Sequence, residues 1–472
     1  MKDVLLSLLP VAWLLLSLSV LKLKAWQATL SAFAVGVAVS LLFFRGALPP
    51  AEIPSVAASG VLFALCPICL VVLAALFTYA VAVESGAMAA IRTGLAKMSD
   101  DRRVLALLVV WGFGNFMEGM AGFGTAVAIP AAILVGIGFD PMKAVVMCLV
   151  ANTVPTAFGS VGVPLLTLAG ESGTDVSRLA WVAAALQCAV AAATPVLLLL
   201  VMDGFRALKG MGKTLLAVDL AFLVPWLAAS RFVGCELPDI VGGLGVMLAI
   251  GTTSGRRVSA AALRRQALAW APFGFVVALL GVNACLPASV KRFITPGALV
   301  LAAGFMGGLV QGVRLPRLLA VLARTLVSYW QALATICFVL ALARVMGAAG
   351  MISAMARALV SATGAAYPYF ATAVGALGGF VTGSGTSSCV LFGRLQADAA
   401  AAVGASPELL AAANVMGAGI GKMICPQSIA IGSAAAGLAG AESRLFKAAL
   451  PWFAGVALAA SVVAGLACRI FR

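Results

Sequence analysis

Long runs of apolar residues, separated by short polar loops, extend along the whole chain. Most runs are close to the roughly 20 residues that an α-helix needs to cross the hydrocarbon core of a bilayer. The pattern predicts an all-α, polytopic transmembrane protein with about 12–14 spans. The candidate spans cover residues 4–21, 25–44, 57–83, 104–138, 141–169, 178–202, 214–231, 237–252, 269–285, 296–312, 326–346, 367–393, 408–440 and 445–470.

Three of these spans, 104–138, 141–169 and 408–440, contain too much glycine and proline for one continuous helix. Both residues interrupt the backbone hydrogen-bond ladder, and free backbone groups are costly in lipid unless they line a cavity or meet a ligand. We therefore expect broken helices or re-entrant hairpins near 114–170 and near 378–440. Close helix packing through small residues is the alternative explanation for these glycines.

The composition supports a membrane protein and argues against a soluble one. Of the 472 residues, 63% are hydrophobic and only 10% are charged, whereas about a quarter are charged in a soluble globular chain. We expect a single integral domain over residues 1–472, embedded in the lipid bilayer of the inner (plasma) membrane. The net charge of +15 does not indicate nucleic-acid binding, because the basic residues lie in short loops between spans, where they set membrane orientation.

Two distant segments share a spacing of polar, glycine and proline residues. The first set matches the second at a constant separation: Asn152, Gly159, Pro164 and Gly170 correspond to Asn414, Gly421, Pro426 and Gly432. An internal duplication is predicted, with a first repeat over 57–232 and a second over 296–472. Duplicated halves with interrupted spans are typical of secondary transporters, in which half-helix N-termini face anionic substrates.

Two charged residues in these segments are candidates for the site. Glu118 is the only carboxylate between Asp101 and Asp140, so we expect it deep in the bilayer, where a charge costs roughly 2.5–3.5 kcal/mol. Because burial raises the pKa of carboxyl groups in general, such a residue suits proton coupling. Lys422 could pair with Glu118 or bind a substrate carboxylate, and Arg344 is a second candidate cation. A purely structural ion pair and a lysine that reaches the interface are the alternatives.

Further candidates for substrate binding are small or uncharged polar residues beside the predicted breaks. They are Gly122, Gly124, Asn152, Thr386, Ser387, Ser388 and Asn414. The chain contains 10 cysteines and no histidine. Only Cys66 and Cys69 have CxxC spacing, without a second pair to complete a zinc site. No metal, cofactor or catalytic residue is predicted.

At these residues the chain resembles the L-lactate permease family. The resemblance rests on these strings: Asn115-Phe-Met-Glu-Gly-Met-Ala-Gly-Phe-Gly-Thr-Ala-Val-Ala-Ile129, Leu149-Val-Ala-Asn-Thr-Val-Pro-Thr-Ala-Phe-Gly-Ser-Val-Gly-Val-Pro164, Met202-Asp-Gly-Phe-Arg206, Glu236-Leu-Pro-Asp239, Thr382-Gly-Ser-Gly-Thr-Ser-Ser388 and Gly421-Lys-Met-Ile-Cys-Pro-Gln-Ser428. It is dense over 84–240 and 366–450. The family commonly has Asp where Gly385 stands and Asn where Cys389 stands.

The resemblance implies a secondary transporter that imports L-lactate, D-lactate or glycolate together with protons. The hypothesis from the sequence is symport of a lactate-like organic anion with H⁺, with Glu118 as the proton-coupling residue. A sulfonated or longer acid, Na⁺ coupling, a passive channel and an intramembrane enzyme are the rival hypotheses. The sequence is also compatible with a homo-oligomer.

Overall fold

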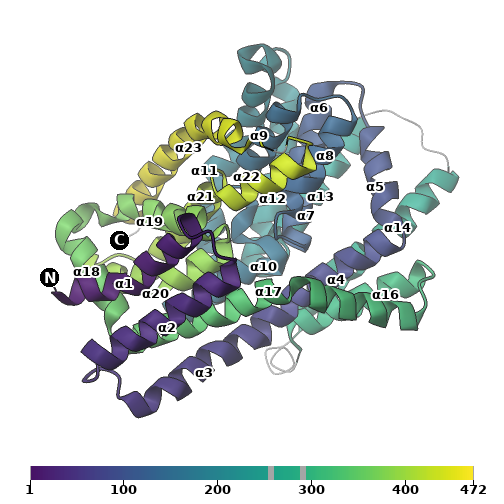
Figure 1. Ribbon diagram of the computed structural model, residues 1–472. Helices are drawn as coiled ribbons and strands as arrows, with labels where there is room; N and C mark the ends of the chain where they lie inside the picture. The colour runs from purple at the N-terminus through teal and green to yellow at the C-terminus, as the bar shows by residue number, and fades with distance from the viewer. Residues whose placement is uncertain (1, 254–259, 287–293, 439, 471–472) are drawn as a thin grey trace.

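The computed structural model describes residues 2–253, 260–286, 294–438 and 440–470, which form helices joined by short loops (Figure 1). The first half contains α1 (Lys2–Ser19), α2 (Ala25–Phe43), α3 (Ile53–Phe63), α4 (Leu70–Glu84), α5 (Ala87–Ala96), α6 (Arg102–Ala106), α7 (Gly114–Met120), α8 (Thr125–Gly136), α9 (Pro141–Ala151), α10 (Gly159–Ser172) and α11 (Val176–Asp203). Wider π-helical turns link α3 to α4 at Ala64–Cys69 and α6 to α7 at Leu107–Phe113.

Two helices, α12 (Gly212–Phe232) and α13 (Pro238–Thr253), connect the first half to the second. The second half contains α14 (Ala260–Cys285), α16 (Pro296–Val310), α17 (Leu315–Ala348), α18 (Met351–Thr363), α19 (Tyr367–Thr382), α20 (Gly385–Val403), α21 (Pro407–Lys422), α22 (Pro426–Ala435) and α23 (Glu442–Ile470). Short 3₁₀ turns at Pro50–Glu52, Pro155–Ala157, Gly204–Leu208 and Gly364–Ala366 complete the described chain.

The lengths of the helices fit a bilayer. Within the described ranges, 8 helices are long and apolar enough to cross a membrane, and 9 if the bent pair α21–α22 counts as one span. The predicted polytopic, all-helical fold is confirmed, and so are the three breaks. Residues 104–138 divide into α6, α7 and α8, residues 141–169 into α9 and α10, and residues 408–440 into α21 and α22.

The second half follows the helix order of the first half. Helices α14, α16 and α17 come about 262 residues after α1, α2 and α4, and the helices from α18 to α23 follow those from α5 to α11 at a similar separation. The packing is reciprocal, because α2 packs against α17 while α16 packs against α4. This order supports two related halves, while the exact repeat boundaries 57–232 and 296–472 remain a prediction.

The core of the second half depends on glycines in α19 and α21, which pack against each other more extensively than any other helix pair. Gly375 and Gly379 of α19 meet backbone atoms of Asn414 and Ala418, and Gly417 and Gly421 of α21 meet those of Thr372 and Ala376. A side chain at any of these four glycines would overlap the partner backbone. Here the small residues do serve close helix packing.

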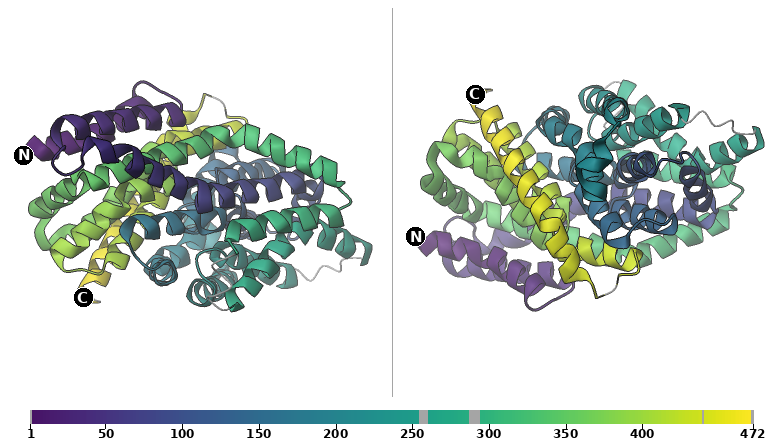
Figure 2. Two further views of the ribbon diagram at one scale, coloured as in Figure 1. Left: turned by 90° about the horizontal axis from the view of Figure 1, so that it is seen from below. Right: turned by 90° about the horizontal axis from the view of Figure 1, so that it is seen from above.

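Both chain termini lie toward the same side of the molecule (Figure 2). The long helix α17 runs alongside α2 and α3 across the front of the first view (Figure 1). The broken helices of the two halves pack against each other, because α8 contacts α22 and α10 contacts α20.

Candidate functional site

The first break carries Glu118 near the end of α7. The helix stops at Met120, and Gly122, Phe123 and Gly124 then take three consecutive left-handed conformations, with φ of 59°, 51° and 86°. Only glycine adopts this region without steric cost, so Phe123 is held there by its surroundings. Thr125 is the first residue of α8, and its hydroxyl donates a hydrogen bond to the Gly122 carbonyl at 2.8 Å. The chain thus reverses within the protein interior.

The second break lies between α9 and α10 and contacts the first. After Asn152 the chain makes a 3₁₀ turn, and Ser160, Val161 and Gly162 are left-handed, with φ of 48°, 58° and 78°. The Ser160 hydroxyl donates to the Ala121 carbonyl at 3.0 Å. A carbonyl that the end of α7 would otherwise leave free is therefore satisfied by a hydroxyl from the neighbouring break.

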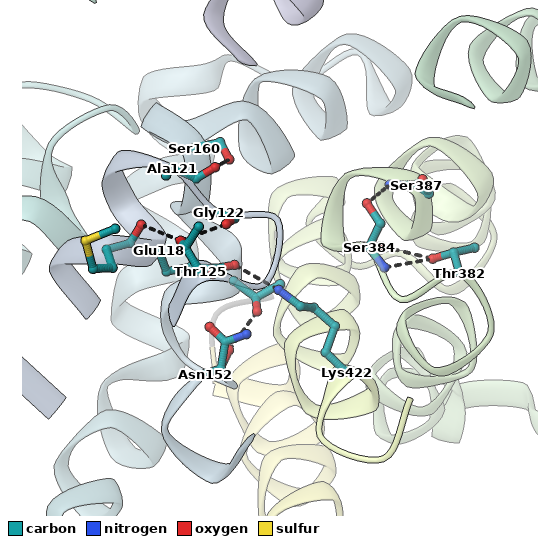
Figure 3. Close-up of polar contacts among 12 residues, drawn as sticks. Glu118, Ala121, Gly122, Thr125, Asn152, Ser160, Thr382, Ser384, Ser387 and Lys422 are labelled. Carbon is teal, nitrogen blue, oxygen red and sulfur yellow. Dashed lines mark hydrogen bonds and ion pairs between the residues drawn. The ribbon is translucent and has the colours of Figure 1, made fainter. Parts of the chain in front are cut away.

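Lys422 reaches Glu118 from the second half of the chain. It is the last residue of α21, which is followed by a bend of 45° into α22. The Lys422 Nζ lies 2.8 Å from Glu118 Oε1, and the two residues are only 7% and 3% exposed. Figure 3 shows the two side chains pointing toward each other from the two halves. This pairing joins segments 304 residues apart.

Asn152 completes the charged group. With its amide nitrogen facing the carboxylate, Asn152 donates to Glu118 Oε2 at 3.2 Å and its oxygen accepts from Lys422 Nζ at 3.2 Å. Gly159 leaves room for the Glu118 side chain, because a Cβ at that position would lie 3.2 Å from the Glu118 Cγ and Oε1 atoms. Each charge has a partner of the opposite sign, which offsets the large penalty of burial.

A cavity of about 260 Å³ opens onto this pair. Its lining is mostly hydroxyl, amide and glycine residues, with a few apolar side chains. The residues are Ala25, Trp26, Glu118, Phe123, Gly124, Thr156, Gly159, Ser160, Pro164, Gln331, Ala332, Thr335, Ile336, Thr382, Gly383, Ser384, Gly385, Thr386, Ser387, Lys422, Gln427, Ser428 and Ile431. A small cavity of mixed lining, with several hydroxyl groups and a buried cation, suits a small anion with hydroxyl groups.

Three helices begin at the cavity wall. Gly124 precedes α8, Ser384 caps α20 through a hydrogen bond from the Ser387 backbone N–H, and the first turn of α22 contributes Gln427 and Ser428. The first N–H groups of a helix lack partners within the helix, and the helix dipole is positive at that end. Together with Lys422, the converging N-termini make the cavity favourable for an anion.

Comparisons with known proteins agree on one family. The family model described as L-lactate permease matches residues 3–288 and 275–471. An L-lactate permease of Streptococcus iniae is 34% identical over 87% of this chain and 94% of that protein. The chain belongs to the L-lactate permease family. Another member, the glycolate permease GlcA of Escherichia coli, is 32% identical over 94% of this chain and 91% of that protein.

Solved structures support the fold of this family member. MtrF of Neisseria gonorrhoeae superposes with a TM-score of 0.56 at 15% identity, covering 94% of this chain and 96% of that one. The YdaH transporter of Alcanivorax borkumensis superposes with a TM-score of 0.54 at 17% identity, covering 98% of each chain. Family membership and the apolar spans identify a multi-pass protein of the plasma membrane.

The structure brings together only some of the site residues that were predicted from the sequence. Glu118, Lys422, Gly124, Thr386 and Ser387 line the cavity, and Asn152 contacts the charged pair behind it. Their functional roles remain predictions.

The other predicted site residues lie outside the cavity lining. Arg344 pairs with the buried Glu171 at 3.1 Å and lies over the Phe63 ring, so its charge is already engaged. Ser388 donates to the Gly375 carbonyl at 3.0 Å, and Asn414 accepts from Gln396 at 3.3 Å within the α19–α21 core. Gly122 packs against Ser160. These four residues are therefore not included in the proposed site.

Several lining residues were not predicted from the sequence. Trp26 of α2 and Gln331 and Thr335 of α17 form one wall, although both helices are remote from the breaks along the chain. Gln331 is an uncharged polar residue in an apolar run, and this feature of the sequence could have indicated that it lines a polar site. Gln427 and Ser428 lie within the family string that begins at Gly421, and the proline before them indicated a helix start.

Proposed function

We propose that the chain imports L-lactate, or a related short 2-hydroxy monocarboxylate such as D-lactate or glycolate, in symport with protons. Its relatives are named as L-lactate and glycolate permeases, and permeases transport rather than transform their substrates. The observation that carries the proposal is the buried Glu118–Lys422 pair at the wall of a polar cavity of about 260 Å³.

In the proposed mechanism the substrate carboxylate takes the place of Glu118 at Lys422. The empty site contains one anion and one cation in contact, so a second anion would leave an uncompensated charge in a low-dielectric interior. Protonation of Glu118 removes that charge and frees the Lys422 ammonium for the substrate. Binding of the anion and of the proton are therefore coupled by electrostatic balance.

The polar groups around Lys422 would select a 2-hydroxy acid. In this proposal, N–H groups at the starts of α20 and α22 would hold the carboxylate beside Lys422. The hydroxyls of Thr386, Ser387 and Ser428, which line the cavity, would bind the substrate hydroxyl in this proposal. A site that hydrogen-bonds a substrate hydroxyl discriminates strongly against analogues without it, because its own polar groups would be left unpaired.

Movement of one half of the protein against the other would expose the site alternately to the two sides of the membrane. The charged pair itself bridges the halves, since Glu118 is on α7 and Lys422 is on α21. Exchange of Glu118 for substrate at Lys422 would therefore change a contact between the halves. Binding of substrate at the site would therefore directly affect the relative position of the two halves.

The test is uptake of labelled L-lactate by vesicles that contain the protein and carry an imposed pH step. One pH unit corresponds to about 1.4 kcal/mol and drives about tenfold accumulation with one proton. We expect the Glu118→Gln protein to lose accumulation, to a ratio of about one, while retaining lactate exchange at equal pH. The exposed carboxylate Glu52 provides the control, because Glu52→Gln should accumulate lactate normally.

Different outcomes separate the rival functions. Uptake that ignores the pH step but follows a Na⁺ gradient would replace protons with Na⁺ as the coupling ion. Equilibration without accumulation would indicate a passive channel. Competition by unlabelled glycolate, D-lactate, propionate and a short sulfonate would rank the substrates, and propionate should compete poorly because it lacks the hydroxyl. Failure of every 2-hydroxy acid to compete would contradict the proposed substrate class.

A further inference from the structure

A second buried carboxylate, Asp239, lies behind the charged pair and does not line the cavity. It occupies the first turn of α13 and is 1% exposed. Its Oδ1 accepts a hydrogen bond from Trp226 Nε1 at 3.0 Å. Its Oδ2 has no hydrogen-bond partner among the residues that the structure describes. A buried carboxylate with one neutral donor is poorly stabilised as an anion.

Asp239 is adjacent to the segment that carries Glu118. Helix α13 packs against α7, and a Cβ at Gly119 would lie 2.9 Å from the Asp239 Cβ. The absence of a side chain at position 119 therefore lets Asp239 approach the backbone of the residue after Glu118. Glu118 in turn contacts Lys422 through the ion pair at 2.8 Å. The three ionisable side chains form one buried group.

The charges of this group do not balance when both carboxyls are ionised. Lys422 is the only cation among the buried charged residues of the described chain, and it is in contact with Glu118 rather than Asp239. Two anions and one cation would leave a net negative charge in the interior. Such a charge would also repel an incoming carboxylate, so an empty site that accepts an anion requires one proton.

Among the residues that the structure describes, the contacts of Asp239 include no cation that supplies the missing compensation. Helix α12 presents Trp226 to it, while Arg231 at the end of that helix is exposed and lies over the Phe232 ring. The neighbouring segment Leu107–Phe113 has no ionisable side chain. Glu236, just before α13, is an acidic residue and supplies no positive charge.

We propose that Asp239 holds a resident proton that neutralises the empty site and leaves Glu118 free to pair with Lys422. This inference rests on the proposed proton symport and deepens it. Near neutral pH, lactate binding adds one proton, on Glu118, while Asp239 keeps its own. At alkaline pH the empty site loses the Asp239 proton, and lactate binding must then restore it as well as protonate Glu118.

The experiment is calorimetric titration of the full-length protein with L-lactate from about pH 6 to about pH 9. The slope of log Kd against pH gives the number of protons taken up with the ligand. In the wild type we expect a slope that rises from about one proton to about two as the pH increases. In Asp239→Asn, the neutral mimic, the slope should stay at about one, so lactate binding should extend to higher pH. Glu236→Gln is the matched control and should follow the wild type.

Infrared difference spectra give an independent readout of the same proton. The carbonyl band of a buried carboxylic acid should be present in the empty wild type at neutral pH and absent in Asp239→Asn. Lactate should add a second such band in both proteins but not in Glu118→Gln.

The outcomes distinguish this inference from the proposed function. Identical slopes in the wild type and Asp239→Asn, or an acid band that survives that substitution, would overturn the resident proton alone. A wild-type slope near zero at every pH would reject proton symport itself. If Asp239→Asn fails to fold, the pH dependence of the wild-type Kd still tests the inference. A slope that stays near one proton up to about pH 9 would contradict the resident proton.

Discussion

At the scale of the residue, the site depends on charges from distant parts of the chain that stabilise each other. Glu118 and Lys422 are each buried, and each is the other's ion-pair partner at 2.8 Å. Asn152 bridges them, and among the described residues Asp239 has no cation as a contact. A group of this kind responds to any anion that enters the cavity, because a new charge must be compensated within the same few residues.

Replacement of Lys422 by Met should destroy substrate binding and weaken the fold. It leaves Glu118 buried without a cation, and loss of one partner of a buried pair costs about 3–5 kcal/mol of stability. It also removes the proposed carboxylate ligand, so the Kd for L-lactate should rise by about 30-fold or more. Thermal unfolding in detergent and calorimetric titration measure the two effects.

The double variant Glu118→Gln with Lys422→Met separates these effects. It contains no unpaired charge, so its stability should return toward that of the wild type, while lactate binding should stay lost. Normal lactate binding by either variant that lacks Lys422 would show that the substrate carboxylate is held elsewhere.

Glu118 and Lys422 were predictable from the sequence because a charge stands out in an apolar run. Asp239 was not predicted as a site residue, because it comes three residues after Glu236 and directly after Pro238, where an acidic residue is ordinary at a helix start. Its relation to Glu118 exists only through the packing of α13 on α7. Linear spacing carries no information about that contact.

At the scale of the element, the glycines divide into two groups with different physical roles. Gly122, Gly124 and Gly162 adopt left-handed conformations at the points where helices break. Those in α19 and α21 are helical and allow two backbones to approach closely. Both groups look alike in the sequence, so the breaks near 114–170 and 408–440 were predictable, whereas the tight α19–α21 packing was left as an alternative explanation.

Gly421→Ala should destabilise the protein through this close approach. The added Cβ would overlap the Ala376 carbonyl oxygen, and overpacking of this kind typically costs about 1–3 kcal/mol. Because Gly421 immediately precedes Lys422, the same change should also reduce lactate uptake. Thermal unfolding and vesicle uptake check the two effects.

Gly455→Ala in α23 is the matched control. No atom lies within 4 Å of a Cβ at that helical position, so the substitution should be neutral or stabilise by about 0.5–1 kcal/mol. If Gly421→Ala unfolded at the same temperature as Gly455→Ala, backbone contact between α19 and α21 could not be what positions Lys422.

At the scale of the whole molecule, two halves of similar helix order both line the cavity that holds Glu118 and Lys422. The first half supplies Glu118 and its two contacting breaks, and the second half supplies Lys422 with the starts of α20 and α22. The wall formed by α2 and α17 again combines one helix from each half. The sequence repeat indicated two halves, but not that residues of both would line the same cavity.

This symmetry leads to a prediction about charge movement. If the halves rock around a site that takes up one anion and one proton together, the loaded and empty forms carry the same net charge. A membrane potential should then do no work on the cycle. By contrast, a net charge that crosses the membrane gains about 2.3 kcal/mol per 100 mV, equivalent to roughly 50-fold accumulation.

Lactate accumulation in proteoliposomes under a potassium diffusion potential tests this directly. With equal pH on both sides, an inside-negative potential of about 100 mV should leave the lactate ratio near one, whereas a step of one pH unit without a potential should raise it about tenfold. Accumulation driven by the negative-inside potential alone would mean that positive charge enters with the substrate. In that case more than one proton would cross with each lactate, and Asp239 would release its proton in every cycle instead of keeping it.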